Sequence, residues 1–127
     1  MKHILVVDDE APIRMLLEKI LQSAGYRVTS VPDGTAALKA AREDPPDLAI
    51  SDLSMPGIDG FTLCSMLKRD KTFKAPILVL SGRISEKDHQ DALRAGANAF
   101  VSKPVERESL LATVAKWLDE GEKPSSE

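Results

Sequence analysis

Apolar and polar positions follow two regular patterns along this chain. Short apolar runs rich in β-branched residues are typical of strands buried on both faces of a parallel sheet. Between these runs, apolar residues recur at helical spacing, most clearly between Pro12 and Gly25. The pattern predicts strands over residues 4–7, 26–31, 47–51, 77–81 and 99–102. The second of these alternates more than the others, so we expect it nearer a sheet edge.

Capping and turn residues predict a helix after each strand. Pro suits the first turn of a helix, Asp and Ser cap helix starts, and Gly fits the residue after a helix end. The expected helices begin at Pro12, after Asp33, at Asp59-Gly60, after Ser85 and near Glu106, the last ending near Leu118.

Strict alternation of five strands with five helices predicts an α/β fold. It should form a single doubly wound parallel sheet whose right-handed crossovers place helices on both faces. We expect one domain over residues 1–120 and a polar tail, or the start of a linker, over 121–127. Ligands of such sheets bind outside the carboxyl ends of the strands, at the switch in strand order.

Composition and charge limit the kinds of function that the chain can have. The 127 residues suffice for one ordinary domain, and the net charge of −3 gives no indication of direct nucleic-acid binding. The one cysteine, Cys64, is interpreted as a small buried hydrophobe, and His3 and His89 as incidental. A strand begins at once and no apolar run approaches membrane-spanning length, so we expect a soluble cytoplasmic domain without membrane contact.

Polar residues whose side chains can act in catalysis or binding follow four of the predicted strands. Each taken alone has an ordinary interpretation, such as a helix-start acid, a turn residue or a surface lysine. The carboxyl ends of parallel strands share one edge, so these side chains should lie together. Neighbouring carboxylates favour a cation, Mg²⁺ suits such a site, and a lysine and a hydroxyl can contact a phosphate. The set suits phosphoryl transfer onto a carboxylate; its members are Asp8, Asp9, Asp52, Ser81 and Lys103.

Over about residues 2–119 the chain resembles the receiver domain of two-component response regulators, and it is similar to the single-domain chemotaxis regulators. The resemblance implies the flavodoxin-like strand order 2-1-3-4-5. It is carried by four motifs: Val6-Val7-Asp8-Asp9-Glu10, Ser51-Asp52-Leu53-Ser54-Met55-Pro56-Gly57-Ile58-Asp59-Gly60, Leu80-Ser81-Gly82 and Phe100-Val101-Ser102-Lys103-Pro104.

The resemblance implies a phosphate-accepting signalling switch rather than an enzyme acting on a separate substrate. Asp52 would take a phosphoryl group from a sensor histidine kinase or a phosphotransfer protein, in a Mg²⁺-dependent reaction. Asp9, Asp52 and the backbone carbonyl of Ser54 would bind Mg²⁺, and Asp8 would hold a metal-bound water. The domain would catalyse only its own phosphorylation and dephosphorylation.

Further implied roles concern the response to phosphorylation. Lys103 and Ser81 would contact the phosphoryl oxygens, and Phe100 would change rotamer. The surface of the fourth helix, fifth strand and fifth helix would then change its binding to a downstream output protein or domain. We also expect a cis peptide bond between Lys103 and Pro104, although cis bonds are a small minority of X–Pro bonds.

Two alternatives compete. A phosphatase of the haloacid-dehalogenase class would need an acid two residues after its nucleophile. Glu10 has that spacing from Asp8 but stands where aspartate is expected, and the chain looks too short for a cap domain. A phosphorylation-independent interaction module of the same fold is opposed by the intact acid set. No glycine-rich loop supports nucleotide binding.

Overall fold

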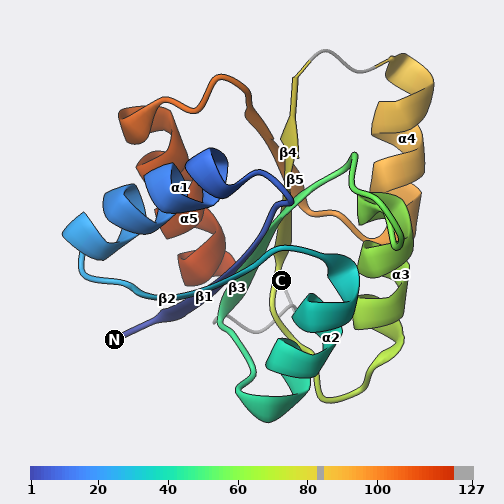
Figure 1. Ribbon diagram of the computed structural model, residues 1–127, viewed down its shortest axis with the longest axis horizontal. Helices are drawn as coiled ribbons and strands as arrows, with labels where there is room; N and C mark the ends of the chain where they lie inside the picture. Colours follow the sequence, from blue (N-terminus) through green and yellow to red (C-terminus); the bar gives the residue numbers. More distant parts are fainter. Residues whose placement is uncertain (83–84, 122–127) are drawn as a thin grey trace.

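Figure 1 presents the computed structural model of the chain, which describes residues 1–82 and 85–121. Within these residues, five strands and five helices alternate along the chain. The strands pair in parallel in the order β2-β1-β3-β4-β5, which confirms the predicted fold class and strand order. They are β1 (His3–Val7), β2 (Arg27–Val31), β3 (Leu48–Asp52), β4 (Ile77–Ser81) and β5 (Ala99–Ser102).

The helices divide between the two faces of the sheet. In Figure 1, α1 (Ala11–Ser23) and α5 (Arg107–Gly121) lie on one side of the strands. On the other side lie α2 (Gly34–Glu43), α3 (Gly60–Arg69) and α4 (Glu86–Ala95). None of the helices within the described residues combines the length and the apolar character needed to cross a bilayer.

Two hydrophobic cores result, one on each face. Successive strand residues point to opposite faces, so Ile4 and Val6 pack with α1 and α5, whereas Leu5 and Val7 pack towards α2 and α3. Cys64 is fully buried in the core that faces α2 and α3, and burial raises the pKa of its thiol to about 11. It therefore behaves as the small hydrophobe that the sequence predicts.

Three of the expected helix caps are present. Asp33 Oδ1 accepts a hydrogen bond from the Ala36 N–H at 2.8 Å, and Asp59 Oδ1 accepts one from the Thr62 N–H at 2.9 Å. Ser85 Oγ accepts one from the Asp88 N–H at 3.0 Å. These caps satisfy backbone donors that a helix start leaves free, so α2, α3 and α4 begin where the turn residues indicate.

Some boundaries differ from the expected ones. Asp52 is the last residue of β3 instead of the first residue after it, and α5 extends to Gly121 instead of ending near Leu118. The proposed tail therefore loses its first residue to α5, and its remainder, residues 122–127, lies outside the described residues. The Lys103–Pro104 peptide bond is cis, as expected.

At the amino end of the strands a polar network surrounds His3. The His3 N–H donates to Asp47 Oδ2 at 2.7 Å, and Nε2 lies 2.8 Å from Thr29 Oγ1. Arg27 pairs with Asp44 at 2.7 Å nearby. His3 is 3% exposed, so its interpretation as incidental was wrong: the buried imidazole joins β1 to β2.

Candidate functional site

The carboxyl ends of β1 and β3 bring three carboxylates together. Val7 pairs with Ser51 in the sheet, so Asp8 and Asp9, which follow Val7, lie beside Asp52. One oxygen atom from each of the three carboxylates lies within 4.8 Å of the others. Asp8 and Asp52 are buried and Asp9 is exposed. Like charges this close repel one another unless a cation or a proton joins them.

Asp8 lies deepest in this acid cluster of Asp8, Asp9 and Asp52. Its Oδ1 accepts a hydrogen bond from the Glu10 N–H at 2.9 Å, whereas its Oδ2 is buried and has no hydrogen-bond partner. Burial raises the pKa of the Asp8 carboxyl above 3.8, and the charge of Asp52 adds to the rise; the Glu10 N–H and Lys103 oppose it. A buried carboxylate oxygen without a partner fits a site that receives a cation or its bound water.

Lys103 approaches the acid cluster from the end of β5. Its Nζ lies 3.2 Å from Asp52 Oδ1 and 4.0 Å from Asp8 Oδ2. The Lys103 N–H donates to the Ser81 carbonyl at 2.8 Å, which fixes the backbone beside β4. One ammonium beside three ionised carboxylates leaves two negative charges, so the cluster has the charge that a divalent cation neutralises.

A pocket of about 310 Å³ opens over these side chains. Asp8, which is fully buried, does not line it, and neither does Phe100. The structure therefore brings five of the seven predicted site residues to one pocket: Asp9, Asp52, Ser54, Ser81 and Lys103.

Phe100 lies outside the pocket, against α4. Its ring stacks on the imidazole of His89 in α4, with centroids 4.0 Å apart and planes 23° apart. The interpretation of His89 as incidental was therefore wrong. Only the packing of α4 beside β5 brings position 89 to position 100, and no periodic pattern in the sequence carries that information.

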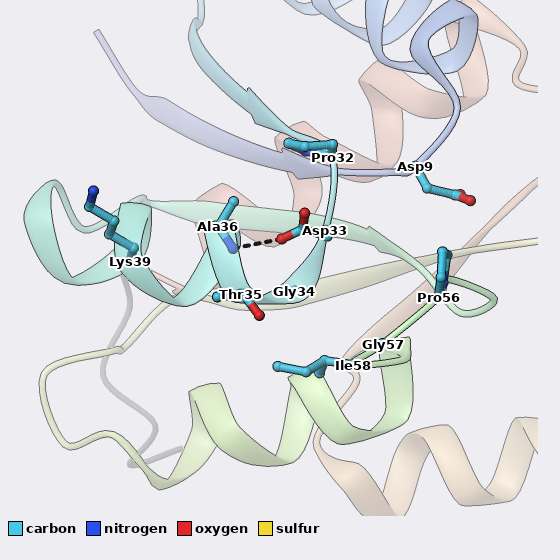
Figure 2. Close-up of a pocket in the computed structure, with 10 residues that line it drawn as sticks. All are labelled: Asp9, Pro32, Asp33, Gly34, Thr35, Ala36, Lys39, Pro56, Gly57 and Ile58. Carbon is cyan, nitrogen blue, oxygen red and sulfur yellow. Dashed lines mark hydrogen bonds between the residues drawn. The ribbon is translucent and has the colours of Figure 1, made fainter.

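A second pocket, of about 650 Å³, adjoins the acid cluster at Asp9 (Figure 2). Figure 2 shows the Asp33 carboxylate turned to its capping bond with Ala36, so Asp33 is already committed to α2. Gly34 packs so closely on Ile58 that an added Cβ would lie 2.8 Å from the Ile58 Cβ. The residues lining this larger pocket do not include Asp52 or Lys103, so the reactive groups gather in the smaller one.

The smaller pocket suits one kind of chemistry. Asp52 offers a carboxylate nucleophile at a rigid strand end, with an ammonium beside it and the Ser81 residue at the rim. Phosphoryl transfer depends mainly on positioning and on stabilising charge at the phosphoryl oxygens. A carboxylate in this arrangement has the positioning and the neighbouring positive charge that accepting a phosphoryl group requires.

Comparison with known proteins points the same way. The family model described as "Response regulator receiver domain" matches residues 4–115. Among curated proteins, the transcriptional regulatory protein AfsQ1 of Streptomyces coelicolor is 37% identical over 127 residues, covering 100% of this chain and 56% of AfsQ1. The chain thus spans about half the length of several of the curated relatives it matches.

Solved structures agree on the fold. Chemotaxis protein CheY4 of Vibrio cholerae superposes with a TM-score of 0.89 at 35% identity, covering 92% of this chain and 98% of CheY4. The receiver domain of sensor histidine kinase PA1611 from Pseudomonas aeruginosa has a TM-score of 0.86 at 29% identity, covering 93% and 98% of the two chains. That structure holds a magnesium ion coordinated in its active-site cleft.

Proposed function

Since this chain belongs to the response regulator receiver domain family, whose members are signalling switches phosphorylated on an aspartate, we propose that Asp52 takes the phosphoryl group. One observation carries the proposal. The Lys103 ammonium lies 3.2 Å from Asp52 Oδ1, within the pocket that Asp9, Ser54 and Ser81 also line. No other described carboxylate combines a strand end, an ammonium partner and a place in that pocket.

The reaction uses an oxygen of the Asp52 carboxylate as the nucleophile. That oxygen forms a bond to the phosphorus of a phosphohistidine, the phosphorus–nitrogen bond breaks, and the imidazole nitrogen leaves with the electron pair. Lys103 gives up its pairing with Asp52 and contacts the phosphoryl oxygens, where negative charge is concentrated. The Ser81 hydroxyl donates a hydrogen bond to the same oxygens.

Receiver domains bind Mg²⁺ at an acidic pocket, and we propose that Asp9, Asp52 and the backbone carbonyl of Ser54 hold it here. The Asp8 Oδ2 atom, which has no hydrogen-bond partner, supports the proposal, because Asp8 would accept a hydrogen bond from a water bound to the ion. When bound, Mg²⁺ supplies positive charge that offsets the charge of the transferring phosphoryl group.

Upstream and downstream partners follow from family membership. Donors would be a sensor histidine kinase or a phosphotransfer protein, and the readout would be an output protein or domain, because related regulators are longer than this chain. A cytoplasmic location and catalysis limited to the domain's own phosphorylation and dephosphorylation belong to the same proposal.

Intact-mass measurement after incubation with Mg²⁺ and acetyl phosphate tests Asp52. The wild-type protein should gain one phosphoryl group, and Asp52→Asn should gain none. Asp59→Asn makes the same charge change in the next loop and keeps a capping side chain for α3, so it should be phosphorylated normally. A phosphoryl adduct that persists in Asp52→Asn would place the site elsewhere.

Calorimetric titration with Mg²⁺ tests the metal site. Asp9→Ala should weaken binding most, because it removes a direct ligand. Asp8→Ala removes a water-holding group but also relieves repulsion within the acid cluster, so its effect should be smaller. Unchanged affinity in Asp9→Ala would contradict the proposed site.

The phosphatase alternative has a poor geometric basis. It would use Asp8 as the nucleophile, but that side chain is fully buried and does not line the pocket. Asp8 Oδ1 accepts a hydrogen bond from the backbone N–H of Glu10. Glu10 stands two residues after Asp8, at the position where that enzyme class has its catalytic acid. Turnover of a generic phosphomonoester by the wild-type protein would revive this alternative.

A further inference from the structure

The stack between His89 and Phe100 joins two elements that the sheet itself does not connect. Phe100 lies on β5, His89 lies on α4, and their ring centroids are 4.0 Å apart. An interplanar angle of 23° makes this a stacked aromatic pair. We call it the His89–Phe100 stack.

Phe100 is not held by close packing on every side. The ring is half-buried, and a pocket of about 420 Å³ lies against it, bounded by Ser102 of β5 and by Ser109 and Thr113 of α5. A side chain with open space beside it has room to change rotamer. The His89 ring is thus a contact that selects one orientation for Phe100 among those that the space allows.

The helix on the other side of the stack is weakly anchored. All residues of α4 lie in the described part of the chain, and Ala92 is the one that is fully buried. Leu93, the largest apolar side chain of α4, is 41% exposed. The stack is therefore, with the packing of Ala92 and Ala95 on the core, one of the contacts that hold α4 in place.

Ser81 shares the face of the sheet on which Phe100 lies. Val79 pairs with Phe100 and Ser81 pairs with Ser102, and side chains two residues apart on a strand point to the same face. Ser81 lines the phosphoacceptor pocket, whereas Phe100 lines the pocket beside α5. A Phe100 ring that swings towards Ser81 has to leave the imidazole.

We infer that His89 is a positioning residue that holds Phe100 against α4 and so restrains the switch until Asp52 is phosphorylated. This inference rests on the proposed function, in which Phe100 reorients after phosphorylation. Breaking the His89–Phe100 stack releases the Phe100 ring and α4 together. This couples phosphorylation of Asp52 to the surface formed by α4, β5 and α5.

The strength of aromatic pairs sets the size of the effect. Losing one such pair changes the equilibrium between the stacked and the released orientation by about two- to twelvefold. Removing the His89 ring should raise the ratio of released to stacked Phe100 by that factor. A ligand that binds the released state then binds more tightly by the same factor, as long as that state is a minor one. Beryllofluoride, a phosphate mimic, supplies such a ligand.

Fluorine NMR reports the position of Phe100 directly. The chain has three phenylalanines, so labelling with 4-fluorophenylalanine gives three resonances, and Phe100→Leu identifies the one from Phe100. The variants are His89→Ala, His89→Phe, which keeps an aromatic face, and Gln90→Ala, a matched change at an exposed neighbour. If the alanine variant does not fold, His89→Leu keeps the volume without the aromatic face.

Without beryllofluoride, the Phe100 resonance of His89→Ala should move towards its beryllofluoride-saturated position. The apparent beryllofluoride affinity should rise by the same factor, while His89→Phe and Gln90→Ala stay at the wild-type values. A wild-type resonance position and affinity in His89→Ala would overturn the inference, and so would His89→Phe behaving like His89→Ala.

The two proposals fail differently. If the wild-type protein forms its adduct with acetyl phosphate and binds beryllofluoride but the His89 variants change nothing, the inference alone is wrong. If the wild-type protein forms no adduct and binds no beryllofluoride, the proposed function is wrong and the inference falls with it.

Discussion

At the scale of single residues, the site depends on an imbalance of charge. Asp8, Asp9 and Asp52 lie together, and Lys103 is their one ammonium partner among the described residues. Asp8 is fully buried, so water does little to screen its charge. The folded protein therefore holds an arrangement that is unfavourable for stability and useful for binding a cation and a phosphoryl group.

Lys103→Ala should slow phosphorylation of Asp52 by acetyl phosphate about 100-fold. The estimate follows from the loss of one group that stabilises charge as it develops in a transition state. Intact mass followed over time gives the rate. Lys39→Ala removes an exposed lysine beside the neighbouring pocket and should leave the rate unchanged. A Lys103→Ala rate within threefold of wild type, roughly the scatter expected of a neutral change, would show that Lys103 has no catalytic part.

Asp8→Asn should increase the free energy of unfolding at pH 7 when Mg²⁺ is removed with a chelator. Burial raises the pKa of Asp8 in the folded state, so ionisation destabilises the folded state above that raised pKa. The cost shrinks as the pH falls from the raised pKa towards the ordinary value of 3.8 and disappears below 3.8, where Asp8 is protonated in both states.

Urea unfolding of wild-type protein and Asp8→Asn between pH 4 and pH 7 measures this dependence. The stability gain of the variant should shrink as the pH falls. Asp44→Asn is the control, since the hydrogen bond from Arg27 lowers the pKa of that exposed carboxyl and the variant should gain no stability. A gain for Asp8→Asn that is equal at both ends of the pH range would contradict the argument.

At the scale of elements, local patterns predicted most of what the structure contains. Strand β4 begins and ends where the apolar run indicates, and Asp33, Asp59 and Ser85 cap their helices. These features depend on neighbouring residues, so the sequence carries them. The His89–Phe100 stack depends on how α4 packs beside β5, and no local pattern of residues marks that packing.

Gly60→Ala should destabilise the protein by about 1–3 kcal/mol, the usual cost of overpacking. A Cβ at Gly60 would lie 2.7 Å from the Leu53 Cα and would also overlap the Asp52 carbonyl oxygen. Both neighbours are backbone atoms of Asp52, the proposed phosphoacceptor, and of Leu53 beside it, so the clash should displace Asp52 as well. Chemical denaturation measures the first effect, and the acetyl phosphate reaction measures the second.

Gly82→Ala is the matched control for that prediction. Apart from its chain neighbours, no atom of the described residues lies within 4 Å of a Cβ placed at Gly82, so the free energy of unfolding should change by less than about 0.5 kcal/mol. Equal destabilisation by the two substitutions would show that helix or loop propensity, and not the close approach of α3 to β3, decides the cost.

At the scale of the whole molecule, the helices are anchored unequally to the sheet. The core under α1 and α5 includes Leu17, Leu21, Leu110 and Val114, whereas α4 adds the small Ala92 to the opposite core. Elements with few buried apolar contacts are the ones that open or shift most readily. A conformational change that begins at Asp52 should therefore extend to α4 and β5 more readily than to α1.

Beryllofluoride with Mg²⁺ should shift backbone amide resonances from Asp52 to residues 85–110, and leave those of β2 near their original positions. Moving a population from 1:99 to 99:1 takes about 5.5 kcal/mol. Two or three charge-assisted contacts at the phosphate supply that amount if each contributes towards the upper end of about 1.5–3 kcal/mol. Changes confined to the surroundings of Asp52 would contradict this account of the switch.

The network around His3 has a consequence for how the domain can diverge. It lies at the opposite end of the strands from the acid cluster, and a five-residue strand separates the two by roughly 16 Å. Substitutions this far apart, without shared partners, affect stability independently. Gains made around His3, Arg27 and Asp44 can therefore compensate for the electrostatic burden at Asp8, which gives this chain a reserve of stability against which substitutions near the acid cluster can be tolerated.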